Sequence, residues 1–370
     1  MKHINIMIKP ASSLCNLRCR YCFYEDVSSS REIPSYGVMK ADVMSSMLLN
    51  IRNSLTEGDR VTFAFQGGEP TVAGLDYFKN FVEITDTWKE ISVAFALQTN
   101  GTLLNGEWCT FLKEHQFLVG LSWDLLPDCH NEARVDAVGK GTEHIIEHTL
   151  HLLNSSGIEY NILCTLTNFV ARHPDKVWRQ IQKYNIRYVQ FTPCLDFMDS
   201  ARHSSYALTP RRFFSFYDQL FTLWIREFQK GNYVSVKLFD DIVNLLAYGI
   251  PTACGINGFC GKQLVVEADG SVYPCDFYCL PTYKMGHLNQ KSLQEICESP
   301  QASLFLARDK HLPELCTDCT YNTFCHGNCE RMRSQIGCEN DTTFCGYQAF
   351  LNAHGKELSW IATLQQRSQE

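Results

Sequence analysis

Six short runs of apolar and β-branched residues alternate with stretches of helical periodicity, and this alternation limits the possible folds more than any other feature. The runs are INIMI, VTFAF, VAFAL, FLVGLS, YNILCTL and YVQFTP, at residues 4–8, 61–65, 93–97, 117–122, 160–166 and 188–193. Between them, helices are predicted at 38–56, 73–87, 105–115, 143–156 and 174–184. Strands that alternate with helices form parallel sheets. We therefore expect an α/β fold over residues 1–207, a partial (β/α)6 barrel similar to a TIM barrel.

Polar motifs follow the predicted strands. In α/β barrels the active site lies on the loops that follow the C-terminal ends of the strands. The loop after the first strand contains three cysteines, and the next loop contains QGGEP. The third and fourth strands run into QTNG and SWD. We expect these four motifs to face one cleft.

The pattern changes after residue 207. The aromatic-rich stretch TPRRFFSFYDQLFTLWIREFQKG predicts a helical linker region at 208–250. A second domain, dense in cysteine, glycine and short turns, is expected at 251–350, with a helical tail at 351–370. Within this domain QLVVEADGSVYPC predicts a hairpin, because Asp269-Gly270 suits the left-handed conformations of a tight turn.

The composition excludes several classes of protein. The net charge is −7 and the pI is about 6.0. This leaves no basic excess for binding nucleic acid or an anionic membrane, so neither is expected as a partner. The N-terminus MKHINIMIKPASSLCNL lacks the apolar core and cleavage site of a secretory signal, and no apolar run is long enough to span a bilayer. We expect a cytoplasmic protein.

The chain contains 18 cysteines. In a reducing compartment they cannot be interpreted as a disulfide framework, because thiol pools keep most such pairs reduced. Metal binding or redox catalysis is the better interpretation.

Three of these cysteines, Cys15, Cys19 and Cys22, form the loop CNLRCRYCFY. They offer three thiolates where a cubane cluster has four irons, so one iron is left open to chelate a small ligand. The alternatives are a zinc knuckle or three unrelated thiols. In QGGEP, Gly67 and Gly68 present backbone without a Cβ, so that a ligand's ammonium can approach, and Glu69 supplies negative charge nearby. A tight turn after a strand is the alternative for these glycines.

Eight further cysteines have the spacing C-x5-C-x14-C, then C-x2-C-x5-C-x3-C-x15-C, and fit two clusters with four ligands each. Full ligation suits electron transfer or structural bracing. A pair of zinc ribbons is the rival interpretation, since CxxC pairs are also zinc signatures. Cys279 and Cys338 lie close enough in sequence to be alternative ligands.

The CxxxCxxC loop, with Tyr21 before its third cysteine, resembles the radical S-adenosylmethionine superfamily. The C-terminal spacing resembles the SPASM domain. Together these resemblances imply three 4Fe-4S clusters. The catalytic cluster would be held by Cys15, Cys19 and Cys22, auxiliary cluster one by Cys254, Cys260, Cys275 and Cys329, and auxiliary cluster two by Cys316, Cys319, Cys325 and Cys345.

Nearly the whole chain looks like the anaerobic sulfatase-maturating enzymes. The likeness lies in IKPASSLCNLRCRYCFY, FAFQGGEPTVAGLDYF, LQTNGTLLNGEW, FLVGLSWD, VVEADGSVYPCDFY and the CTDC and CHGNC run. It implies oxidation of a sulfatase cysteine or serine to Cα-formylglycine, after a 5′-deoxyadenosyl radical abstracts hydrogen. The implied partners are an unfolded or nascent sulfatase segment of CxPxR type and a flavodoxin or ferredoxin-like electron donor.

The resemblance also implies roles for single residues. S-adenosylmethionine would be bound by Tyr21, Gly68, Ser122, Arg134 and Leu195. Asp276 matches the family's base and directly follows the predicted ligand Cys275, so proton and electron acceptors could lie at the same edge of the substrate. From the residues alone, Asp276 could instead cap a turn, and Arg134 could be a solvated surface arginine. Asn100 could bind cofactor or peptide, or form a turn.

Two stretches depart from the family's motifs. Asp124-Leu125-Leu126-Pro127 stands where DGP is common, and Gly141-Thr142-Glu143 stands where GTF is usual.

Two rival functions are compatible with the same fold and cysteine motifs. One is a SPASM enzyme that forms thioether or carbon-carbon crosslinks in another ribosomal peptide, since one fold supports several chemistries. The other is a non-catalytic metal-binding or electron-transfer protein.

Overall fold

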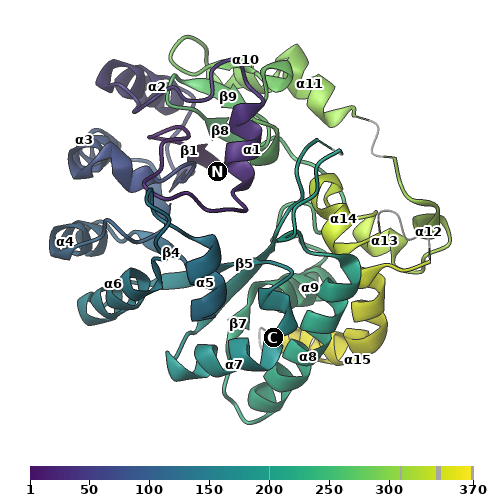
Figure 1. Ribbon diagram of the computed structural model, residues 1–370. Coiled ribbons are helices and arrows are strands. Elements are labelled where there is room, and N and C mark those ends of the chain that lie inside the picture. Colours follow the sequence, from purple (N-terminus) through teal and green to yellow (C-terminus); the bar gives the residue numbers. More distant parts are fainter. Residues whose placement is uncertain (200, 309–310, 339–342, 368–370) are drawn as a thin grey trace. The chain divides into compact units, whose positions relative to one another are not determined.

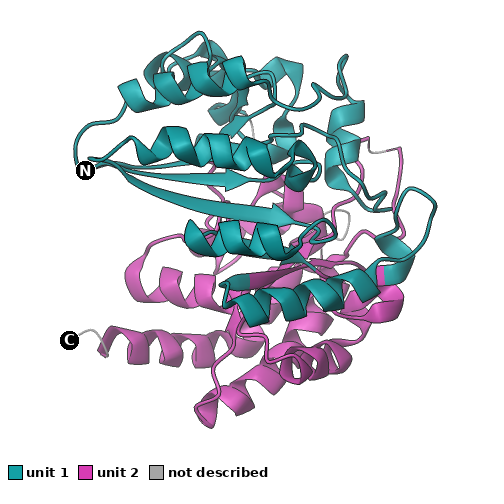
Figure 2. Ribbon diagram, turned by 90° about the vertical axis from the view of Figure 1, so that its left-hand side faces the viewer, with its two compact units in different colours: residues 1–122, 131–160, 261–308 teal, residues 123–130, 161–260, 309–370 magenta. Residues whose placement is uncertain are grey.

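The computed structural model describes residues 1–199, 201–308, 311–338 and 343–367. The chain divides into two compact units, each assembled from separate stretches of sequence (Figure 2). Unit 1 comprises Met1–Ser122, Asn131–Tyr160 and Gly261–Arg308, and unit 2 comprises Trp123–His130, Asn161–Cys260 and Asp309–Glu370. The predicted domain boundaries at 207, 250 and 350 remain a prediction.

Unit 1 is built on a sheet in which the first four predicted strands are confirmed. They are β1 (His3–Ile8), β2 (Arg60–Phe65), β3 (Ser92–Thr99) and β4 (Leu118–Ser122), and neighbouring strands are parallel. The register places Ile8 beside Phe65 and Phe65 beside Leu97, and all three side chains are buried. The carboxyl ends of these strands therefore lie along one edge of the sheet.

The predicted hairpin is confirmed, and it extends the same sheet. Strands β8 (Leu264–Val266) and β9 (Ser271–Tyr273) are antiparallel, and Gly270 in the turn has φ +84°. β8 pairs in parallel with β1, with Ile6 opposite Leu264, and the short strand β10 (Gly286–His287) pairs with β9. Residues 264–266 are thus neighbours of the first strand.

The helices of unit 1 cover this sheet, and α2, α3, α4 and α6 follow one another along its outer face in Figure 1. The buried face of α3 is largely aromatic: Phe65 of β2 packs edge-to-face on Phe78 and Phe81 of α3, with ring centroids 4.9 and 5.0 Å apart. The helices are α1 (Phe23–Ser29), α2 (Ala41–Asn53), α3 (Leu75–Asp86), α4 (Gly106–Glu114), α6 (Glu143–Ser156), α10 (Leu293–Cys297) and α11 (Pro300–Leu306), with 3-10 turns η1 (Pro70–Ala73), η3 (Asp276–Tyr278) and η4 (Pro281–Tyr283).

Unit 2 contains the remaining predicted strands and the long C-terminal helices. β5 (Tyr160–Leu166) pairs in parallel with β6 (Tyr188–Pro193), and β6 pairs in parallel with β7 (Ser235–Val236). The helices are α7 (Pro174–Lys183), α8 (Pro210–Gln229), α9 (Lys237–Tyr248), α12 (Glu314–Thr317), α13 (Asn322–Cys325), α14 (Arg333–Ile336) and α15 (Gly346–Arg367), with η2 (Val170–Arg172), η5 (Glu330–Met332) and α5 (Pro127–Ala133), which begins in this unit.

The core of unit 2 is also aromatic. Phe239 of α9 stacks on Phe350 of α15, with ring centroids 5.8 Å apart and planes 9° apart. Phe221 of α8 lies against both rings. These contacts join α8, α9 and α15 in one packed core. Among the described residues, no helix has the length and apolar character needed to cross a membrane.

Candidate active site

The three-cysteine loop lies between β1 and α1 in unit 1. The backbone N–H of Leu17 donates to Cys15 Sγ (3.3 Å), and Cys22 immediately precedes α1. All three cysteines are half-buried. Burial raises the pKa of Cys15 to about 11 and also raises the pKa of Cys22. Both thiols are therefore protonated at neutral pH, and metal binding would release their protons.

The QGGEP loop packs directly on the cysteine loop. The N–H of Gly68 donates to Ser12 O and that of Glu69 to Leu14 O, both at 2.8 Å. A Cβ at Gly68 would lie 2.2 Å from Leu14 O, a backbone atom that has little freedom to move. Gly68 is therefore needed for the close approach of the two loops.

Glu69 links two loops. Its side chain is buried, and it accepts hydrogen bonds from Thr71 Oγ1 and Thr99 Oγ1 (2.7 Å each) and from Asn100 N (2.7 Å). Burial raises the pKa of Glu69, while these hydrogen bonds oppose the rise. Both carboxylate oxygens therefore join QGGEP to QTNG. The predicted contribution of Glu69 to the charge near a ligand stays a prediction.

Asn100 combines the two roles that its sequence context left open. Its Oδ1 accepts from Thr102 N (3.0 Å), as in a turn. Its Nδ2 donates to Asn16 Oδ1 (2.9 Å) and lies 3.9 Å from Cys15 Sγ. The turn after β3 therefore also braces the cysteine loop.

Arg134 is buried, with 8% of its surface exposed, and is not a solvated surface arginine. The backbone N–H groups of Arg18 and Arg20 donate to Val135 O (2.7 Å) and Ala133 O (2.9 Å), which holds the segment around Arg134 against the cysteine loop. The guanidinium carbon lies 5.4 Å from the centroid of the Tyr21 ring, a cation–π distance. Two predicted cofactor-pocket residues are thus adjacent.

The two other residues predicted to bind the cofactor, Ser122 and Leu195, lie at or after the carboxyl ends of strands. Ser122 is the last residue of β4 in unit 1 and is 8% exposed. Leu195 follows β6 in unit 2 and is 9% exposed. In unit 1 the structure therefore gathers Tyr21, Gly68 and Arg134 around the cysteine loop.

Asp276 begins the 3-10 turn η3 after β9, and its carboxylate forms an ion pair with Lys9. The Nζ–Oδ1 distance is 2.5 Å, and the side chains are 0% (Lys9) and 16% (Asp276) exposed. Burial lowers the pKa of Lys9, but Asp276 and neighbouring acidic groups raise it well above its usual value overall. The Lys9 ammonium also lies 3.4 Å from the centroid of the Tyr24 ring. Asp276 therefore does more than cap a turn.

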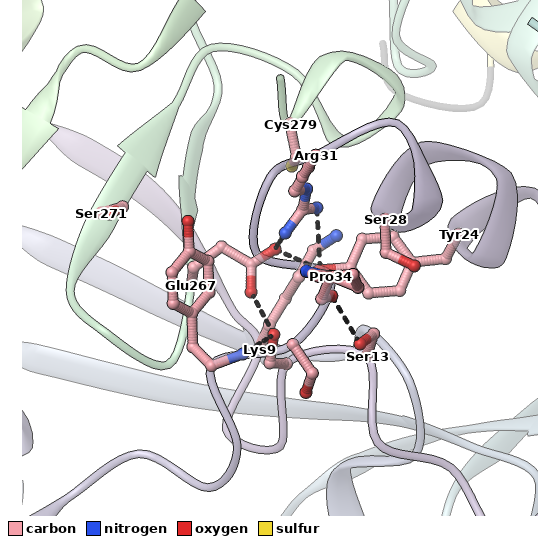
Figure 3. Close-up of polar contacts among 12 residues, drawn as sticks. Lys9, Ser13, Tyr24, Ser28, Arg31, Pro34, Glu267, Ser271 and Cys279 are labelled. Atoms are coloured by element: carbon pink, nitrogen blue, oxygen red, sulfur yellow. Dashed lines mark hydrogen bonds and ion pairs between the residues drawn. The ribbon is translucent and has the colours of Figure 1, made fainter. Parts of the chain in front are cut away.

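Glu267 lies beside this pair, and Figure 3 shows its carboxylate facing Arg31 and the Tyr24 hydroxyl. It accepts hydrogen bonds from Arg31 Nη1 (2.9 Å), Ser12 Oγ (3.0 Å) and the Tyr24 hydroxyl. We call Lys9, Tyr24, Arg31, Glu267 and Asp276 the buried ion cluster. Sequence reasoning missed it, although a lysine directly after an apolar strand and a glutamate inside an apolar hairpin were visible signals.

Four cysteines predicted for auxiliary cluster two are brought together in unit 2. One cavity is lined by Cys316, Cys319, Cys325 and Cys345, and also by Cys338. Gln348 donates from Nε2 to Cys319 Sγ (3.3 Å) and from its backbone N–H to Cys345 Sγ (3.5 Å). The cavity therefore has one thiol more than a four-ligand cluster requires.

The cysteines predicted for auxiliary cluster one are divided between the units. Cys254, Cys260 and Cys329 belong to unit 2, and Cys275 belongs to unit 1. A Cβ at Gly255 would lie 2.7 Å from Cys329 Cβ, so the segment carrying Cys254 packs closely on Cys329. Cys279, the alternative ligand, is buried, and its thiol donates to Cys275 O (3.6 Å). Within the described ranges, no three His, Cys, Asp or Glu side chains form a single-ion site.

Both departures from the family's motifs have a structural setting. Leu125 is fully buried and has φ +64°, a left-handed conformation that favours glycine and strains a leucine. Glu143 is the first residue of α6, where its charge suits the helix N-terminus, and its N–H donates to Asn131 Oδ1 (3.0 Å).

Two family models match the chain. The Radical SAM superfamily model matches residues 10–185, and the SPASM iron-sulfur cluster-binding domain model matches residues 258–320. The first match covers the three-cysteine loop and the predicted strands at 61–65, 93–97, 117–122 and 160–166. The second covers the hairpin, Asp276 and the first two cysteines of the CxxC run.

Curated relatives cover almost the whole chain. A cysteine-type anaerobic sulfatase-maturating enzyme of Clostridium novyi (strain NT) is 38% identical, and the match covers 98% of each chain. A serine-type anaerobic sulfatase-maturating enzyme of Bacteroides thetaiotaomicron is 28% identical, covering 90% of this chain and 84% of the relative.

A solved structure, native anSMEcpe with bound AdoMet and Cp18Cys peptide, is 35% identical to the chain. It superposes with a TM-score of 0.89, covering 98% of this chain and 99% of that one. This match confirms the predicted α/β fold with a C-terminal SPASM domain.

Proposed function

Since the chain belongs to the family of anaerobic sulfatase-maturating enzymes, we propose that it oxidises a side chain of a sulfatase to Cα-formylglycine. The observation that carries this proposal is the grouping of three thiols, Gly68 and Arg134 in unit 1. We infer that the target residue is cysteine, because the cysteine-type relative is 38% identical and the serine-type relative 28%.

The donor sets fit the clusters that this function requires. Thiols are the usual ligands of iron-sulfur clusters, and each predicted set consists of thiols alone. We assign the catalytic cluster to Cys15, Cys19 and Cys22, auxiliary cluster one to Cys254, Cys260, Cys275 and Cys329, and auxiliary cluster two to Cys316, Cys319, Cys325 and Cys345. When bound, the reduced catalytic cluster and S-adenosylmethionine supply the 5′-deoxyadenosyl radical that abstracts hydrogen from the target Cβ.

Residues of unit 1 bind and orient the cofactor. Arg134 presents a planar guanidinium that matches the carboxylate of S-adenosylmethionine. Its cation–π contact with Tyr21 restricts the position of the guanidinium. Gly68 keeps backbone, rather than a side chain, against the cysteine loop. We also propose Ser122 and Leu195 as cofactor-binding residues, as the family resemblance implies.

Asp276 is the proposed base. After hydrogen abstraction, Asp276 accepts the thiol proton as the substrate loses one electron. Cys275 would help to hold auxiliary cluster one, which would serve as the electron acceptor. The target carbon and sulfur are then joined by a double bond. Water attacks this carbon, and sulfur leaves as hydrogen sulfide, which gives the aldehyde. The ion pair with Lys9 holds the Asp276 carboxylate in one place for this step.

We further propose an unfolded or nascent sulfatase segment of CxPxR type as the substrate, a flavodoxin or ferredoxin-like protein as electron donor, and the cytoplasm as the location. An extended segment is required because the target side chain must reach a half-buried loop. A low-potential donor is required because the catalytic cluster must be reduced before it can cleave the cofactor.

The direct test is anaerobic incubation of the reconstituted, reduced enzyme with S-adenosylmethionine and a CxPxR-type peptide. Mass spectrometry should detect the aldehyde, and a hydrazide reagent should label it. A peptide with alanine at the target position is the control. Release of 5′-deoxyadenosine without an aldehyde contradicts the proposal, and a product that has lost two hydrogens but does not react with hydrazide would indicate the crosslinking function.

A further inference from the structure

We propose that Lys9 is a positioning residue that fixes the Asp276 carboxylate for proton transfer, and that the rest of the buried ion cluster holds Lys9 in place. This inference rests on the proposed role of Asp276 as base. It concerns the orientation of the carboxylate, which an ammonium at 2.5 Å restricts directly.

The backbone brings the two residues together. Lys9 directly follows β1, and its N–H donates to Val266 O at 2.8 Å, continuing the pairing of β1 with β8. Asp276 follows β9, the partner of β8 in the hairpin. The lysine and the carboxylate are therefore held by adjacent strands of one sheet, so the geometry of the pair is set by the fold of unit 1.

The surroundings of Lys9 leave its ammonium little freedom. One face lies on the Tyr24 ring at 3.4 Å, and the Tyr24 hydroxyl is itself bonded to Glu267. The Glu267 carboxylate is already engaged by Arg31 and Ser12 (Figure 3). Among carboxylates in the described part of the chain, Asp276 is the one that forms an ion pair with Lys9.

Stability alone gives a poor reason for this arrangement. The Lys9 side chain is 0% exposed. The desolvation free energy of a buried ammonium can exceed the favourable Coulomb energy of a single ion pair. Apolar side chains of similar volume often stabilise a core equally well. Asp276 is the more exposed member of the pair, with 16% of its side chain accessible. In the proposed mechanism it is also the group that contacts the substrate. A buried cation behind a partly exposed carboxylate is the arrangement expected for positioning.

The test is a double-mutant cycle with Lys9→Met, Asp276→Asn and the double variant. Methionine has a similar length and no charge, so it keeps the packing while removing the ammonium. We expect Lys9→Met to lower kcat for aldehyde formation by about 10²-fold, with KM for the peptide nearly unchanged and 5′-deoxyadenosine still released. The double variant should be no slower than Asp276→Asn, because Lys9 acts through Asp276.

Two further variants control the experiment. Lys9→Arg keeps a cation and should recover part of the lost kcat. Lys79→Met removes the lysine of an exposed pair with Glu107 (2.9 Å) and should leave kcat unchanged. Iron content and cofactor binding of each variant should equal those of the unmodified enzyme, which separates positioning from a general loss of structure.

Additive effects of Lys9→Met and Asp276→Asn would overturn the inference, as would an unchanged kcat for Lys9→Met. Loss of cofactor cleavage in a variant that retains its iron would also overturn it, since Lys9 would then act on an earlier step. If Lys9→Met does not fold, the same cycle with Lys9→Arg decides between additive and non-additive effects. Failure of the proposed function is distinguishable, because the unmodified enzyme would then form no aldehyde.

Discussion

The cysteines of the two units are presented in different ways. In unit 1, three thiols lie on one continuous loop. The N–H groups of the QGGEP loop donate to carbonyls that precede the first cysteine, and N–H groups of the cysteine loop donate to the carbonyls of residues 133 and 135. In unit 2, five thiols from separate segments, including the short helices α12 and α13 and the residue before α15, line one cavity. The first arrangement depends on loop contacts, and the second depends on how several segments pack around a space.

One chain thus uses cysteine thiols for two different purposes. The loop has Tyr21, Gly68 and Arg134 beside it, residues suited to a small ligand with a carboxylate. The cavity of unit 2 instead has Gln348, which donates hydrogen bonds to cysteine sulfurs. Such hydrogen bonds tune the reduction potential of a fully ligated cluster. We therefore expect the three-cysteine loop to leave one iron open to an exchangeable ligand, and the cavity of unit 2 to hold a cluster whose ligands all come from the protein.

Replacement of a loop thiol gives the largest expected effect. Cys15→Ala should abolish both 5′-deoxyadenosine release and aldehyde formation, because two thiolates cannot retain the catalytic cluster. Iron should fall from about twelve to about eight per chain, since each cluster contains four irons. Anaerobic iron and sulfide quantification beside a cleavage assay measures both. Full cleavage activity would contradict the assignment of the open-iron cluster to this loop.

Replacement of the proposed base should separate the two chemical steps. Asp276→Asn removes the proton acceptor and should lower aldehyde formation by about 10²-fold or more, while cofactor cleavage continues. The three clusters should remain, with about twelve irons per chain. Quantifying 5′-deoxyadenosine and aldehyde in the same reaction gives the ratio. An unchanged yield of aldehyde would remove Asp276 from the base role.

A smaller effect is expected where the two loops touch. In Gly68→Ala the new Cβ would meet Leu14 O at 2.2 Å and displace the cysteine loop from QGGEP. We expect about tenfold weaker S-adenosylmethionine binding, roughly 1.4 kcal/mol, measured by spectroscopic titration of the reduced protein. Gly106→Ala is the matched control, since its Cβ would meet nothing within 4 Å. Equal affinities for the two variants would count against the loop contact.

The smallest effect is expected for the fifth thiol of the cavity. Cys338→Ala should keep about twelve irons per chain, because four other cysteines satisfy the cluster. Cys316→Ala in the same cavity should lose about four irons. If Cys338→Ala also lost about four irons, Cys338 would be a ligand and one of the four assigned cysteines would not be.

The sequence predicted the parts of the fold that depend on local pattern. The six β-rich runs and the helices between them follow from periodicity, and the Asp269-Gly270 turn follows from the conformational freedom of glycine. The pairing of β8 with β1 joins residues about 260 positions apart. Local patterns contain no information about such a contact, so the hairpin was predicted but its place in the sheet was not.

The same limit applies to the site. The spacing of Cys15, Cys19 and Cys22 was informative because all three lie on one loop. The ion pair of Lys9 with Asp276 was not predictable, because it depends on the pairing of β1 with β8. For Glu69, the motif was recognised from the sequence, but the hydrogen bonds that its carboxylate accepts from Thr99 and Asn100 were not predicted.

The pairing of β1 with β8 also has a consequence for biosynthesis. One edge of β1 is covered by β2, which is made early, but the other edge is covered by a strand that begins at residue 264. Until the ribosome has released that strand, the outer edge of β1 exposes unpaired amide and carbonyl groups, a template for association with other chains. The nascent protein therefore passes through an aggregation-prone interval, which a chaperone would shorten.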